Sequence, residues 1–70
     1  MRDWLMEKRI QSGNKQINVA KKSGITQQFY NMIETGKRRP SPEVAQRIAA
    51  VLGFDWTLFF DPPTDTDKSA

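Results

Sequence analysis

Four glycines divide most of this 70-residue chain into short segments, and their spacing constrains the fold more than any other feature. Gly13, Gly24, Gly36 and Gly53 each follow a stretch that has the pattern of a short helix. Glycine is the common residue just after the last turn of a helix. No segment alternates polar and apolar residues for long, and no Asn-Gly or Asp-Gly pair marks a β-hairpin. The sequence therefore predicts an all-α fold.

The predicted helices also have favourable first residues. Thr26 and Ser41 are of the type that caps helix N-termini, and Pro42 suits the first helical position. Lys15 stands at the cap position before the second helix, so we expect Asn14 to cap that helix instead. The helices are predicted at residues 3–12, 16–23, 27–35 and 42–52, with a fifth short helix that starts at Asp55 and stops before Pro62.

The apolar residues of these helices recur at the spacing of one buried face. The third helix places Tyr30 and Ile33 inward, and Ile25 closes the angle between the second and third helices. The other residues predicted to face the core are Val19 and Ala20 on the second helix, and a stripe of Val44, Ile48, Val51 and Leu52 on the fourth helix.

The composition excludes several chemistries. The chain has no Cys and no His, so it holds no disulfide, no Cys/His zinc site and no His-based catalytic triad. No apolar run approaches the roughly 20 residues that cross a bilayer, and the first residues become charged too soon for a secretory signal. We therefore expect a cytoplasmic protein that is not an enzyme, with no metal, cofactor, membrane partner or evident small-molecule ligand.

Charge is distributed unevenly along the chain. Residues 1–60 have a net charge of +5, whereas residues 61–70 have a net charge of −2. Between Lys15 and Arg39, six cations accompany a single anion, Glu34. A basic middle favours a polyanionic partner. We predict one domain at residues 1–60 and a disordered acidic tail at residues 61–70.

The most informative segment is 16–33. Its two helices are joined by a few residues around Gly24, which tolerates the positive φ of a tight turn. Ala20 lies one turn before the glycine, where only a small side chain lets the helices approach. This spacing is that of a helix-turn-helix.

The run from Gln16 to Ser41, above all Ile33-Glu34-Thr35-Gly36-Lys37-Arg38-Arg39-Pro40-Ser41, resembles the Cro/phage-repressor family of helix-turn-helix proteins, often called XRE-like. The resemblance covers about residues 4–60. It implies a five-helix, lambda-repressor-like domain that binds double-stranded operator DNA and regulates transcription. It also implies an ion pair between Arg9 of the first helix and Glu34. We expect a prokaryotic or phage repressor that binds DNA as a homodimer.

The third helix is then the recognition helix, and its first turn points into the major groove. Glutamine amides can pair with the N6/N7 edge of adenine, so Gln27 and Gln28 are the first candidates for base contacts. Asn31 and Met32 lie one turn further on and are further candidates. The residues expected to hold phosphates are Lys15, Gln16, Thr26, Thr35, Lys37 and Arg38.

Plainer interpretations stay open. The cations could form a solvated face, the exposed amides could be ordinary surface residues, and the Arg9–Glu34 pair could lie at the surface and stabilise little. Trp4, Trp56, Phe59 and Phe60 are most simply core residues, although some of them could form a dimer contact. The rival function is a protein-interaction module, such as an antitoxin or an anti-repressor partner.

Overall fold

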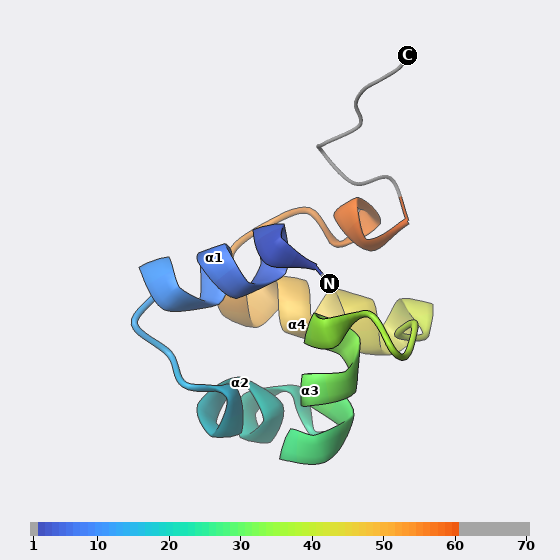
Figure 1. Cartoon of the computed structure of the whole chain (residues 1–70). Coiled ribbons are helices and arrows are strands. Elements are labelled where there is room, and N and C mark those ends of the chain that lie inside the picture. Colours follow the sequence, from blue (N-terminus) through green and yellow to red (C-terminus); the bar gives the residue numbers. More distant parts are fainter. Residues whose placement is uncertain (1, 61–70) are drawn as a thin grey trace.

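The computed structural model describes residues 2–60 (Figure 1). Four α-helices, α1 (Asp3–Gln11), α2 (Gln16–Ser23), α3 (Gln27–Thr35) and α4 (Pro42–Leu52), are followed by a 3-10 helix, η1 (Trp56–Phe59). These residues contain no β-strand, so the all-α prediction is confirmed. The four α-helices begin and end within one residue of the predicted bounds. The predicted acidic tail, 61–70, lies outside the described residues.

The predicted fifth short helix is present as the four-residue 3-10 helix η1, so the described residues form four α-helices and one 3-10 helix, and a count of five α-helices is not confirmed. Asp55 caps it, with a carboxylate oxygen that accepts a hydrogen bond from the Thr57 amide at 3.0 Å. The Phe60 amide donates to the carbonyl three residues back, that of Thr57. Only six residues separate Asp55 from Pro62, and 3-10 geometry is common in such short pieces.

The predicted caps of α3 and α4 are confirmed. The Thr26 hydroxyl accepts a hydrogen bond from the Phe29 amide at 3.0 Å, and the Ser41 hydroxyl accepts one from the Val44 amide at 3.2 Å. The expectation for α2 is wrong. Its N-cap is Lys15, whose side chain makes no capping hydrogen bond. The Asn14 side chain does not cap the helix, because its Nδ2 donates to the Ser12 hydroxyl at 2.9 Å.

One core is shared by all five elements. Its buried members are Leu5 from α1, Val19 and Ala20 from α2, Tyr30 and Ile33 from α3, Ala45 and Ile48 from α4, and Phe59 from η1.

The predicted stripe on α4 is only partly right. Ile48 is buried, but Val44, Val51 and Leu52 are half-buried, and the fully covered neighbours of Ile48 are Ala45 and Ala49. The helix α4 packs against α2, and the buried side chains on α4 include the small residues Ala45 and Ala49 while three larger apolar residues stay partly exposed.

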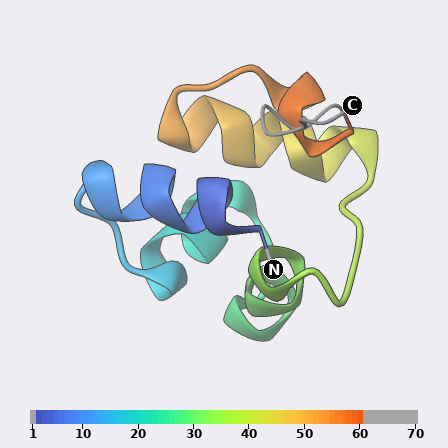
Figure 2. The same ribbon diagram turned by 45° about the horizontal axis from the view of Figure 1, so that its top comes forward.

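A group of aromatic residues from α1, η1 and the loop between α4 and η1 packs together at the core. The rings of Trp4, Phe54 and Phe59 meet at centroid distances of 5.2 to 5.6 Å, mostly edge to face. Trp56 packs edge to face on Phe60 at 5.9 Å, and Phe60 is 41% exposed. In both views of the fold, η1 lies at the opposite end of the molecule from the first turn of α3 (Figures 1 and 2).

Candidate nucleic-acid interface

The turn between α2 and α3 depends on Gly24. Its φ of 74° lies in the left-handed region, which costs a residue with a Cβ atom free energy that glycine avoids. A Cβ atom added there would be in ordinary contact, 3.5 Å from an Arg47 nitrogen, so the requirement for glycine comes from the backbone rather than from space. The next amide, that of Ile25, donates to the Ala20 carbonyl at 3.0 Å. This bond ends α2 and directs the chain into α3.

The first turn of α3 presents polar side chains to solvent. Gln27, Gln28 and Asn31 are exposed, and Met32 is half-buried. Phe29, between them in sequence, is half-buried and packs against the core. The hydrophobic face of α3 thus fixes the helix to the domain, while its opposite face exposes three amide side chains to solvent.

Glu34, near the end of α3, is buried and accepts four hydrogen bonds. Its Oε2 accepts from Arg9 Nε at 2.8 Å and from the Tyr30 hydroxyl at 2.8 Å. Its Oε1 accepts from Arg9 Nη2 at 3.2 Å and from Gln16 Nε2 at 3.0 Å. A carboxylate offers about four acceptor positions, so this group is fully satisfied. The structure thus brings Arg9 and Glu34 together in a largely covered pair.

These contacts control the ionisation of the group. Burial by itself raises the pKa of Glu34, but the hydrogen bonds from Arg9, Gln16 and Tyr30 outweigh burial and bring the pKa below its ordinary value. The bond to Glu34 raises the pKa of Arg9. Burial, followed by the bond to Glu34, raises the pKa of Tyr30 far above its ordinary value. At neutral pH the carboxylate is therefore ionised and the phenol is protonated.

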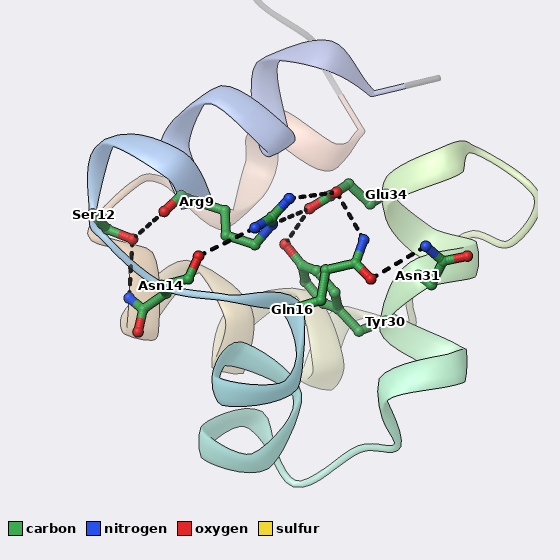
Figure 3. Close-up of polar contacts among 7 residues, drawn as sticks. All are labelled: Arg9, Ser12, Asn14, Gln16, Tyr30, Asn31 and Glu34. Atoms are coloured by element: carbon green, nitrogen blue, oxygen red, sulfur yellow. Dashed lines mark hydrogen bonds and ion pairs between the residues drawn. The ribbon is translucent and has the colours of Figure 1, made fainter.

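Gln16 connects this buried site to the surface (Figure 3). While its Nε2 donates to Glu34, its Oε1 accepts from Asn31 Nδ2 at 3.2 Å. Arg9 also donates to the Asn14 carbonyl at 3.1 Å, which holds the loop before α2. One continuous set of hydrogen bonds therefore joins α1, the start of α2 and the exposed face of α3.

Cationic side chains lie on either side of the exposed amides in sequence. Lys15 precedes α2, and Lys37 and Arg38 follow α3; all three are exposed. The amides of Lys37 and Arg38 both donate to the Met32 carbonyl, at 2.9 and 3.1 Å. The loop that carries these two charges is thus tied to the last turn of α3.

The comparisons with known proteins agree with this geometry. Residues 5–59 match the helix-turn-helix family. The chain is also 48% identical over 68 residues to the uncharacterized HTH-type transcriptional regulator YqaF of Bacillus subtilis strain 168. The aligned region covers 97% of this chain and 90% of that protein. The chain belongs to the XRE-like helix-turn-helix family. This family consists of regulators that bind DNA and control transcription.

In this XRE-like domain, three predicted phosphate contacts already have intramolecular roles. The Thr26 hydroxyl accepts the cap bond of α3 and keeps its own hydrogen to donate. The Thr35 hydroxyl donates to the Met32 carbonyl at 3.3 Å, so it must give up this bond to donate to a phosphate. The Gln16 side chain turns toward Glu34 and Asn31, which leaves its backbone amide, at the start of α2, for a phosphate.

The sequence alone missed two contributions to this site. The Arg2 guanidinium donates to the carbonyls of Ile33 and Arg38, the latter at 3.2 Å, and its amide donates to the Glu34 carbonyl at 2.9 Å. No sequence signal indicated this clamp, because Arg2 precedes the first helix. The Tyr30 hydroxyl on Glu34 was accessible to sequence reasoning, since residues four apart share a helix face.

Residues 2–60 contain no group of three or more acidic, Cys or His side chains placed to hold a metal ion. None of the helices formed by these residues combines the length and the apolar character that a membrane span requires.

Proposed function

We propose that this XRE-like protein is a transcriptional repressor that places α3 in the major groove of a double-stranded operator. The observation that carries the proposal is the first turn of α3, where Gln27 and Gln28 are exposed while the opposite face of the helix is buried. An exposed helix of this width fits the major groove, and its amides match the edge of adenine.

The proposed base contacts extend one turn along α3. Gln27 and Gln28 read the first bases, and Asn31 reads a further base. Met32 is half-buried, so its accessible part contributes an apolar contact to a thymine methyl group. These contacts supply the sequence preference.

The proposed phosphate contacts hold the protein in register. They come from the start of α2, through Lys15 and the backbone amide of Gln16, from the Thr26 hydroxyl, and from the end of α3, through Thr35, Lys37 and Arg38. Helix N-termini and cations both favour phosphate. Because these contacts release counterions, binding is expected to weaken steeply as salt is raised.

We further propose that the protein binds as a homodimer through the aromatic end of the domain. Phe60 is 41% exposed, meets the Trp56 ring edge to face, and has the Arg39 guanidinium 5.9 Å from its ring centroid. The element η1 lies at the opposite end of the molecule from the first turn of α3 (Figure 2), so self-association through η1 leaves the base-reading side chains uncovered. To read one operator, the two recognition helices of the dimer must face the same side of the duplex, about 34 Å apart.

Selection of bound sequences from a random duplex pool tests this function. The wild-type protein is expected to enrich a two-fold symmetric site, and Gln27→Ala or Gln28→Ala to lose preference at one or two base pairs. Each lost contact is expected to remove about 1–3 kcal/mol of discrimination. Gln46→Ala, which changes an exposed glutamine of α4, is the matched control and keeps the preference.

The rival protein-interaction module predicts a different result. If the protein is such a module, no sequence is enriched in the selection and labelled DNA is not bound even at low salt. The protein instead binds a protein partner stably. That combination contradicts the proposed function.

A further inference from the structure

The buried carboxylate of Glu34 determines which way the Gln16 amide faces. The ionised carboxylate can only accept hydrogen bonds, and all four of its contacts come from donors. Gln16 must therefore turn its NH2 group toward Glu34, because its carbonyl oxygen would meet a second acceptor there.

The orientation of the Gln16 amide in turn determines that of the exposed Asn31 amide. With its nitrogen toward Glu34, Gln16 has only its oxygen left for Asn31, at 3.2 Å from Asn31 Nδ2. Asn31 is exposed and so is free to turn its amide either way unless something selects one orientation. Figure 3 shows the result, with the Asn31 nitrogen toward Gln16 and the oxygen on the side away from it.

We propose that Glu34, through Gln16, fixes the Asn31 side chain so that its carbonyl oxygen faces the DNA. Glu34 and Gln16 then act as positioning residues, and Asn31 selects a base. This inference rests on the proposed function, because it assigns a base preference to a residue of the recognition helix. An outward oxygen accepts from the exocyclic amino group of adenine or cytosine, whereas guanine and thymine present acceptors at the corresponding positions of the major groove.

The first arm of the test uses the free protein labelled with nitrogen-15. Solvent exchange of the Asn31 side-chain NH2 is measured by NMR and compared with that of the exposed Asn18. The wild-type Asn31 protons are expected to exchange several times more slowly. In Gln16→Met, which keeps the length of the side chain without its amide, the two residues are expected to exchange alike.

The second arm uses selection from a random duplex pool. The base pair read by Asn31 is the one whose preference disappears in Asn31→Ala. The wild type is expected to favour one base pair there by about tenfold, in the orientation that presents the amino group of adenine or cytosine to Asn31. Gln16→Met and Glu34→Gln are expected to accept all four bases at that pair, because the Asn31 amide can then turn either way.

Tyr30→Phe is the matched control. It removes a different donor from the same carboxylate, yet leaves Glu34 to orient Gln16, so the preference at the Asn31 pair is expected to persist. If Glu34→Gln does not fold, Gln16→Met decides the result alone.

Two results overturn the inference: rapid exchange of Asn31 in the wild type, or an unchanged preference in Gln16→Met at the pair that Asn31 reads. Absence of any selected sequence is a separate outcome. It contradicts the proposed function. The solvent-exchange measurement on the free protein still decides whether Glu34 and Gln16 orient the Asn31 side chain.

Discussion

Two ion pairs in this protein have the same length and very different surroundings. Arg9–Glu34 and Arg47–Glu43 are both 2.8 Å apart. The side chains of the first pair are only 15% and 2% exposed, whereas those of the second are 51% and 73% exposed. Distance alone does not indicate what a pair contributes, because solvent screens the exposed charges and the buried charges depend on each other.

The pairs also differ in what they connect. Arg47 and Glu43 are four residues apart on α4, so their contact joins parts of one helix. Arg9 and Glu34 belong to α1 and α3, and Gln16 and Tyr30 complete the site. The buried pair therefore joins α3 to α1.

The largest effect is expected from Glu34→Ala. Removal of the Glu34 carboxylate leaves the largely covered Arg9 guanidinium without an anionic partner. The expected decrease in the free energy of unfolding is about 3 kcal/mol. Urea denaturation followed by circular dichroism measures it. A midpoint equal to that of the wild type would refute the buried role of this pair.

Acid is expected to weaken the same site more gradually. The folded protein holds the pKa of Glu34 below its ordinary value, so as pH falls the unfolded chain takes up the proton first, near pH 4.3. The stability supplied by this carboxylate is therefore complete at neutral pH, and it is lost as pH falls from that point through the folded pKa.

Urea midpoints of the wild type and of Glu34→Gln, measured from neutral pH to about pH 3, test this sign. The difference between the two proteins is expected to shrink as pH falls. The pKa of Asp55 is also lowered by its bonds from Thr57, but this group is present in both proteins and its effect cancels. A difference that grows toward acid pH would show that the sign is wrong.

Ser23 is a buried polar residue that contrasts with Glu34 in its hydrogen bonding. Its hydroxyl is buried and has no hydrogen-bond partner among residues 2–60, in contrast to the four bonds of Glu34. Ser23→Ala is therefore expected to raise the free energy of unfolding by about 1 kcal/mol, since it removes an unsatisfied buried group. A higher thermal midpoint confirms the expectation, and a lower one shows that the hydroxyl has a stabilising role.

The smallest effect is expected for Glu43→Ala. The exposed pair and the charge of Glu43 near the start of α4 together contribute about 0.5 kcal/mol or less. A urea titration in the same buffer as that used for Glu34→Ala provides the direct contrast. Equal losses in the two variants would break the distinction between the pairs.

Much of the fold could be predicted because its signals are local. A cap such as Thr26 or Ser41 and a helix-ending glycine such as Gly24 act within a few residues of themselves. The buried sides of α2 and α3 followed from the spacing of apolar residues. The Arg9–Glu34 contact, by contrast, was expected only from the family resemblance, because 25 residues separate the two partners.

The features that escaped prediction depend on tertiary contacts. Ala45 and Ala49 are buried while larger apolar neighbours on α4 are half-buried, and helical periodicity alone does not show which side of α4 the other helices cover. Arg2 reaches the end of α3 from outside any helix. The inward turn of Gln16 depends on the position of Glu34, which no local pattern specifies.

The most direct test of the proposed function follows the side-chain amides of the labelled protein as the selected operator is added. The account predicts that the NH2 signals of Gln27 and Gln28 shift on binding while that of Gln46 stays in place, and that raising the salt reverses the shifts. Shifts of Gln46 and of the η1 residues with Gln27 and Gln28 unmoved would contradict a recognition helix that reads DNA through its first turn.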